Sequence, residues 1–254
     1  MVMIEMGSPE AIALCGTAFA VGAVHTILGP DHYVPFVAMS RAGGWSTART
    51  LAVTAACGLG HVAGSVAIGL VGLALGIAVL RLESLEAFRG DTAGWLLIGF
   101  GLAYSVWGLV RASRTRSGGP GHAHLHAHAD GTIHSHEHTH HGEHLHVHEQ
   151  PTDEAEPAAA VAVWTPWILF LLFAFGPCEP LIPLLMYPAA KASPWAVAGV
   201  VGAFTLATVG TMLAAVTVLR AGATLVKLPR LDRFAHAFAG LAILACGLLI
   251  KAGL

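Results

Sequence analysis

The stretch HTILGPDH, residues 25–32, places two histidines and an aspartate around a Gly-Pro pair at the end of an apolar run. Pro30 lacks a backbone N–H and its ring clashes with the preceding helical turn, so we expect the helix to kink or break near Gly29. A break frees backbone carbonyls and turns nearby side chains toward a common point. The stretch therefore predicts a broken helix that carries a polar site within apolar surroundings.

The composition sets the class of protein. The chain has 254 residues, of which 55% are hydrophobic and 11% charged, whereas soluble domains have about 25% charged residues. The mean hydropathy is +0.68, and several runs reach the roughly 20 apolar residues that a membrane-spanning helix needs. We therefore expect an all-α polytopic membrane protein. It has no basic patch, so no nucleic-acid partner is expected.

The apolar runs and the polar segments divide the chain into three parts. A polar, low-complexity segment over 112–160 separates transmembrane repeat 1 (1–111) from transmembrane repeat 2 (161–254). This segment cannot bury an apolar core, so we expect it to be largely disordered without a ligand. Six spans are expected, with the fourth broken near Pro177 and Pro180: 10–29, 50–79, 92–111, 162–190, 195–219 and 235–253.

The two halves of the chain resemble each other. GPDHYVPFVAM (29–39) matches GPCEPLIPLLM (176–186), and GLAYSVWGL (101–109) matches GLAILACGL (240–248). Because each half has three spans, the second half must enter the membrane in the opposite orientation. The sequence thus predicts a 3+3 inverted repeat with broken helices, an architecture that places a substrate site near the bilayer midplane.

Lys and Arg predict the orientation, because cytoplasmic loops carry an excess of these residues. The loops after the first, third and fifth spans hold nine of them: Arg41, Arg49, Arg111, Arg114, Arg116, Arg220, Lys227, Arg230 and Arg233. The opposite side holds four: Arg81, Arg89, Lys191 and Lys251. We expect a multi-pass protein of the cell (inner) membrane with both termini outside and segment 112–160 in the cytoplasm.

The histidines at the first break are candidate metal ligands. His25 and His32 are seven residues apart, which returns to nearly the same helix face, about 20° off. Imidazole binds nickel, cobalt, zinc and copper, and the carboxylate of Asp31 compensates cation charge or orients a ring. The alternative is that Asp31 and His32 lie at a membrane surface and are simply solvated.

Two further groups are candidates. His61 is the only histidine of the second span and faces either the site or a neighbouring helix, while Cys57 is a weaker candidate ligand one turn before it. At the second break, FGPCEPLIP (175–183), Glu179 requires a cation, a proton or a basic partner. Cys178 offers a soft sulfur donor there. The alternative role for Glu179 is to cap the broken helix.

The polar segment is dominated by histidine. Closely spaced imidazoles on a flexible chain chelate borderline transition metals near neutral pH, which makes the segment a candidate metal-binding loop. A pH-sensing tract is the alternative. The segment holds twelve of the sixteen histidines: His122, His124, His126, His128, His134, His136, His138, His140, His141, His144, His146 and His148.

These motifs resemble a known family. The pattern H-x5-D-H over 25–32 is similar to the signature of hydrogenase- and urease-associated nickel permeases, and to the related motif of the nickel–cobalt transporter family, whose six-span exporter branch carries a His-rich loop between its halves. GPCEPLIPL (176–184) together with HTILGPDHYVPF (25–36) also resembles urease-accessory-like or sulfite-exporter-like membrane proteins. The resemblance implies nickel or cobalt handling, with His25, Asp31 and His32 as the matching residues.

Three functions follow as hypotheses. The first is a secondary transporter, not an enzyme, that moves nickel, cobalt or zinc as its substrate, with efflux favoured and no organic cofactor. No Walker-type nucleotide motif is present. The second is an exporter of a sulfite-type small anion, which is disfavoured because no Arg or Lys is predicted near the breaks. The third is thiol-based electron transfer through Cys178 with Cys15 or Cys57. The expected partners are the metal ion and the lipid bilayer, and homo-oligomerisation is left open.

Overall fold

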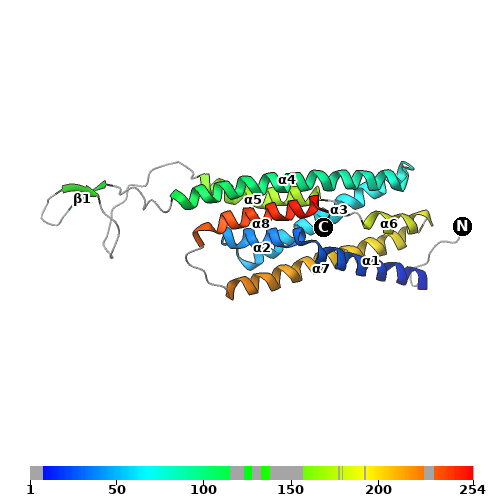
Figure 1. The fold of residues 1–254 in the computed structure, drawn as a ribbon. Coiled ribbons are helices and arrows are strands. Elements are labelled where there is room, and N and C mark those ends of the chain that lie inside the picture. Colours follow the sequence, from blue (N-terminus) through cyan, green and yellow to red (C-terminus); the bar gives the residue numbers. More distant parts are fainter. Residues whose placement is uncertain are drawn as a thin grey trace.

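The computed structural model describes residues 8–114, 123–127, 133–137, 157–176, 178, 180–191, 193–225 and 232–253. Helices run along one long axis and make up nearly all of its secondary structure (Figure 1). Within the described ranges, five helices are long and apolar enough to cross a membrane: Pro9–Leu28, Thr47–Ala74, Val79–Ser113, Pro194–Ala223 and Asp232–Lys251. The chain is thus a multi-pass membrane protein, as its composition predicts.

The first helix is broken where the Gly-Pro pair predicts. Helix α1 (Pro9–Leu28) begins at Ser8, whose hydroxyl accepts a hydrogen bond from the N–H of Ala11. It ends at Gly29, and a single 3-10 turn, η1 (Pro30–His32), leads into the short helix α2 (Val34–Ala42). Because α1 and α2 lie end to end along the long axis (Figure 1), they form one broken helix with η1 at the break.

The second broken helix consists of α5 (Pro157–Ala174) and α6 (Leu181–Ala190), again end to end (Figure 1). The predicted break between 174 and 181 is therefore present. Of its residues, Cys178 and Pro180 are described, whereas the predicted site residue Glu179 lies outside the described residues. Each break therefore lies between two apolar helices that follow one another in the sequence.

Unbroken helices complete the bundle. They are α3 (Thr47–Ala74), α4 (Val79–Arg114), α7 (Pro194–Leu225) and α8 (Ala235–Lys251), the last preceded by the 3-10 turn η2 (Asp232–Phe234). The expected loop over 80–91 is wrong, because α4 already begins at Val79. The charges there are tolerated in a helix because Glu86 and Arg89 pair with each other.

The histidine segment is shorter than predicted at both ends, since α4 reaches Arg114 and α5 begins at Pro157. Between them, β1 (Ala123–Ala127) pairs antiparallel with β2 (Ile133–Glu137). The register places His124 opposite His136 and His126 opposite His134. The other predicted loop ligands lie outside the described residues: His122, His128, His138, His140, His141, His144, His146 and His148.

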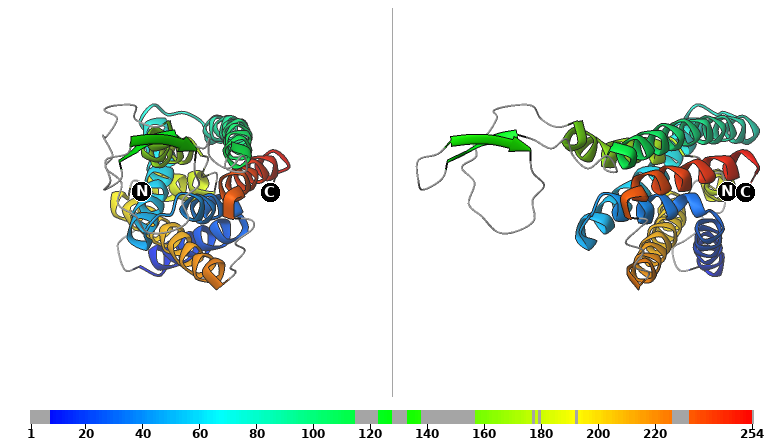
Figure 2. Two further views of the ribbon diagram at one scale, coloured as in Figure 1. Left: turned by 90° about the vertical axis from the view of Figure 1, so that its left-hand side faces the viewer. Right: turned by 60° about the vertical axis from the view of Figure 1, so that its left-hand side comes forward.

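Helix packing pairs elements of the two halves. In the end-on view of Figure 2, α8 lies beside α4 and α1 lies beside α7, and α3 packs on α5. Glycines make the α4–α8 contact close: a Cβ built on Gly101 would lie 2.8 Å from the carbonyl oxygen of Gly240, and one built on Gly240 would lie 2.7 Å from that of Gly101. Small residues of this kind let backbones approach in membranes.

The α4–α8 contact gives a test of the fold. We expect Gly101→Ala to destabilise the protein by about 1–3 kcal/mol, the usual cost of overpacking, because the added methyl group meets the backbone of α8. Gly99→Ala on the same helix is the matched control, since a Cβ there has nothing within 4 Å. Thermal unfolding in detergent measures both, and equal melting temperatures for the two variants would contradict the packing.

Candidate metal centre

The first break orients His32 and Asp31. The carbonyl oxygen of Gly29 lies 3.1 Å from His32 Nδ1, and Asp31 Oδ1 lies 3.3 Å from the same nitrogen. Both oxygens can only accept, so the proton of a neutral His32 is on Nδ1 and its Nε2 carries a lone pair. A Cβ at Gly29 would lie 2.5 Å from His32 Nδ1 and 2.9 Å from Asp31 Oδ1, so a larger residue there would displace both side chains.

His61 on α3 joins this group from across the bundle. Its ring lies edge-on to His32 with 5.1 Å between centroids, and His32 in turn lies 4.9 Å from His25 on α1. The carbonyl oxygen of Phe173, near the end of α5, lies 3.3 Å from His61 Nδ1 and accepts a hydrogen bond from its N–H. His61 Nε2 is therefore also an electron-pair donor.

The three Nε2 atoms share an unusual property. Among the described residues, the buried side-chain atoms without a hydrogen-bond partner are His25 Nε2, His32 Nε2, His61 Nε2 and Thr208 Oγ1. A buried polar atom left without a partner costs about 1–3 kcal/mol. Three such atoms on contacting rings form a cluster of electron-pair donors that a cation would satisfy, with Asp31 as the adjacent negative charge.

Cys178 brings the second break to the same point. Its Sγ and one ring nitrogen each of His25 and His61 all lie within 4.8 Å of one another, and Cys178 is fully buried. Bonds of about 2.0–2.3 Å to a tetrahedral ion place neighbouring ligand atoms about 3.5 Å apart. Small side-chain rotations therefore bring this set to coordination distance. Of the predicted residues, His25, His61 and Cys178 form this group. His32 contacts both histidine rings, and Asp31 lies beside His32.

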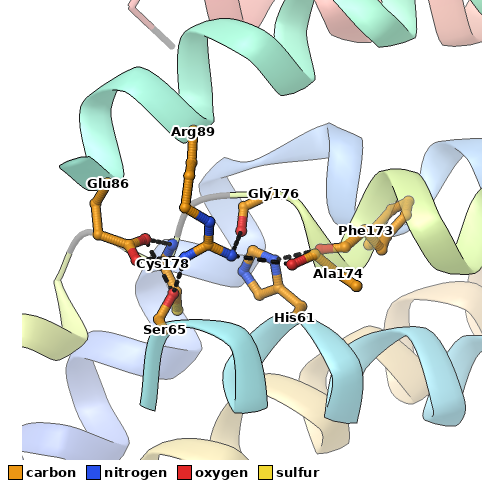
Figure 3. Close-up of polar contacts among 8 residues, drawn as sticks. All are labelled: His61, Ser65, Glu86, Arg89, Phe173, Ala174, Gly176 and Cys178. Carbon is orange, nitrogen blue, oxygen red and sulfur yellow. Dashed lines mark hydrogen bonds and ion pairs between the residues drawn. The ribbon is translucent and has the colours of Figure 1, made fainter. Parts of the chain in front are cut away.

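A buried ion pair adjoins this group (Figure 3). Glu86 is completely buried, pairs with Arg89, and accepts hydrogen bonds from the Ser65 hydroxyl (3.0 Å) and the N–H of Cys178 (3.1 Å). Arg89 also donates to the carbonyl oxygens of Ala174 (2.9 Å) and Gly176 (3.3 Å). The pair therefore satisfies backbone groups on both sides of the second break.

Sequence reasoning missed Glu86 and Arg89, because it placed them in a loop outside the membrane. The available signal was their spacing of three residues, which brings opposite charges together on a helix. The expectation that no Arg or Lys lies near the breaks is likewise wrong, because Arg89 contacts the second one. Its guanidinium is already engaged by Glu86, Ser65 and two carbonyls.

A cavity of about 460 Å³ reaches the cluster from one side. His25, Asp31 and His32 line its inner end, and Asp91 and Lys251, which form an ion pair between α4 and α8, line it further out. The cluster is therefore accessible to a small solute on this side. Because Lys251 pairs with Asp91, Asp31 is the carboxylate of the lining that faces the histidines with its charge available to a bound cation.

Other candidate residues lie elsewhere. Cys57 is buried in the hydrophobic core with Phe36 and is absent from the His25–His61–Cys178 group. Cys15 lies beside Gly199 on the α1–α7 contact. All four cysteines are free thiols. His236, at the start of α8, is hydrogen-bonded to the hydroxyl of Tyr104 on α4, with 2.8 Å between the two atoms.

The chain was compared with protein-family models, with curated proteins and with solved structures, and none of these comparisons gives a match. A function for this protein therefore has to be inferred from the chemistry of the cluster itself: three unpartnered imidazole nitrogens, one carboxylate and one thiol at the junction of two broken helices.

Proposed function

We propose that this protein is a secondary transporter of a divalent transition metal ion, with nickel, cobalt or zinc as its substrate. The observation that carries the proposal is a set of three contacting, buried histidine rings whose Nε2 atoms have no hydrogen-bond partner, inside a membrane protein. Ionisable residues within membrane spans generally mark ion or substrate pathways. The cluster is a binding site for the transported ion, and the protein is not an enzyme.

The donor set favours transition metals. Calcium and magnesium prefer six or more oxygen ligands, whereas imidazole and thiolate bind borderline and soft metals. The Nδ1 partners of His32 and His61 are a carboxylate and backbone carbonyls, the partners that metal-binding histidines usually have in proteins. Asp31 supplies negative charge that offsets part of the charge of the ion.

Several contacts support an inverted 3+3 repeat. The first helix of one half packs on the second long helix of the other, as α1 does on α7 and α5 does on α3. The third helices of the halves meet at their matching glycines, Gly101 and Gly240. Interchanging the two halves turns the α1–α7 contact into the α5–α3 contact and leaves the α4–α8 contact unchanged. In such transporters one repeat rocks against the other around a central site.

The direction of transport is part of the proposal. We infer that both termini lie outside the cell membrane and that the histidine segment lies in the cytoplasm. Arg89 was counted on the outer side but is largely buried in the bundle. The excess of loop Lys and Arg on the predicted cytoplasmic side is therefore kept. Histidines in the cytoplasm would collect metal there, which favours efflux driven by an ion gradient or by the metal gradient.

The arrangement disfavours the two other hypotheses. An anion exporter needs a cation with donors to spare, but Arg89 directs its donors to Glu86, Ser65 and two carbonyls. A thiol-based electron carrier needs a cysteine partner for Cys178, and the groups gathered around its sulfur are histidines.

Removal of the central ligands tests the proposal. We expect His25→Ala and His61→Ala to lower the flux of nickel, cobalt or zinc into proteoliposomes about tenfold or more, because each removes an electron-pair donor from the site. His236→Ala is the matched control, because its ring bonds Tyr104 instead of facing the cluster. Unchanged flux in both ligand variants would refute the site.

Accessibility labelling tests the orientation. A single cysteine introduced near residue 130, in a chain whose four native cysteines are replaced, should react with a membrane-impermeant maleimide only after the cells are opened. A cysteine introduced at Gly253 should react in intact cells. Labelling of the residue-130 variant in intact cells would place the histidine segment outside and overturn the efflux direction.

A further inference from the structure

The Glu86–Arg89 pair acts at both ends of the second break. Arg89 donates to the carbonyl of Ala174, the last residue of α5, which has lost its partner in the next helical turn. Glu86 accepts the N–H of Cys178, just before α6 begins. A cation thus lies at a helix C-terminus and an anion lies before a helix N-terminus, the arrangement that the helix dipoles favour.

This pair has no counterpart among the described residues of the other half. Gly101 matches Gly240 in the alignment of the third spans, which sets Ala235, the first residue of α8, opposite Leu96 of α4. The first turns of α4, which carry Glu86 and Arg89, therefore lack an equivalent in α8. Among the described residues, charged side chains of another helix bond the backbone at the second break and not at the first.

Satisfying the backbone does not by itself require a buried ion pair. Ser8 and Ser46 cap α1 and α3 with single hydroxyl groups. Taking two charges out of water is expensive, and apolar residues of similar size often serve stability as well or better. In addition, the pair fixes the backbone at several points of the segment 174–178 between α5 and α6.

Those points belong to the metal site. Glu86 fixes the backbone of Cys178, whose Sγ belongs to the His25–His61–Cys178 group. Arg89 fixes the carbonyls of Ala174 and Gly176, next to the Phe173 carbonyl that orients His61. Figure 3 shows the guanidinium reaching across to these carbonyls while the carboxylate turns to Cys178.

We propose that Glu86 and Arg89 are positioning residues that hold Cys178 as the sulfur donor of the metal site and thereby give the site its preference for thiophilic metals. Thiolate selects zinc and other soft or borderline ions, whereas imidazole alone also accepts nickel. When the ion binds, the S–H bond of Cys178 would break, its proton would pass to water, and the electron pair left on sulfur would form the bond to the metal. The inference rests on the proposed function.

Cobalt(II) provides a direct probe of sulfur ligation. A thiolate bound to cobalt absorbs in the near ultraviolet by charge transfer, and the histidine segment cannot produce this band because all four cysteines lie outside it. Titration of the purified full-length protein should show the band in the wild type and not in Cys178→Ser. In Glu86→Gln the affinity read from the band should fall about 10–100-fold.

Two variants separate positioning from folding. Glu83→Gln, an exposed acid one turn before Glu86 on α4, is the matched control and should keep the wild-type band. The double variant Glu86→Leu with Arg89→Met removes both charges together, so no unpaired ion is buried, but the Cys178 N–H and the Ala174 and Gly176 carbonyls lose their side-chain partners. Its thermal unfolding in detergent is therefore measured before the band is read, and if it is unfolded, Glu86→Gln decides the test. If the pair is only structural, this folded double variant keeps the band. If the pair positions Cys178, the band is lost.

Transport selectivity gives a second readout. In proteoliposomes, the ratio of zinc to nickel flux should fall about tenfold in Glu86→Gln and by the same factor in Cys178→Ser. His61→Ala should lower both fluxes. The inference is overturned if the wild type lacks the cobalt–thiolate band, if the folded double variant keeps it, or if the zinc-to-nickel flux ratio is unchanged. If His25→Ala and His61→Ala still lower flux in that case, the proposed function stands; if they do not, the function itself fails.

Discussion

The structure depends on one constraint: two helices are broken inside apolar surroundings, and the backbone groups that each break frees must find partners within the protein. Lipid offers no hydrogen bonds, and each unsatisfied group costs several kcal/mol. At the first break the Gly29 carbonyl bonds the His32 ring. At the second, Arg89 and Glu86 reach in from α4. The side chains that solve this problem are the ones that build the site.

The two breaks satisfy their backbone groups with different side chains, and this difference determines which ligand atoms each break contributes to the site. The first break uses its own residues, so its histidines and Asp31 serve both the backbone and the cluster. The second break is held by a neighbouring helix, which leaves the Cys178 sulfur free of that duty. A pair of broken helices that match in sequence thus contributes nitrogen donors on one side and sulfur on the other.

Local sequence determines some of this arrangement and tertiary packing determines the rest. The break at Gly29-Pro30 was predictable because a proline in a helix interior removes a hydrogen bond and clashes with the preceding turn, and here a glycine precedes it. Pro166 and Pro188, which have no glycine before them, lie inside α5 and α6. A lone His61 in an apolar span indicated a buried role. Glu86 and Arg89 were placed in a loop because charged residues close together in the sequence usually lie in water. Their burial depends on each other and on carbonyls of α5, some 85 residues away along the chain. No local pattern specifies those partners.

The packing on the far side of the cluster bears on the proposed transport. Beyond His32, Phe36 of α2 lies against Phe173 of α5 with ring centroids 4.6 Å apart, and both rings are buried in the main core. The opposite side meets the cavity that runs past Asp91 and Lys251. The cluster therefore has one open side and one packed side. Phe36 follows the first break and Phe173 precedes the second. In the transport proposed above, a movement of the two broken helices that opens this side of the cluster would have to separate these rings.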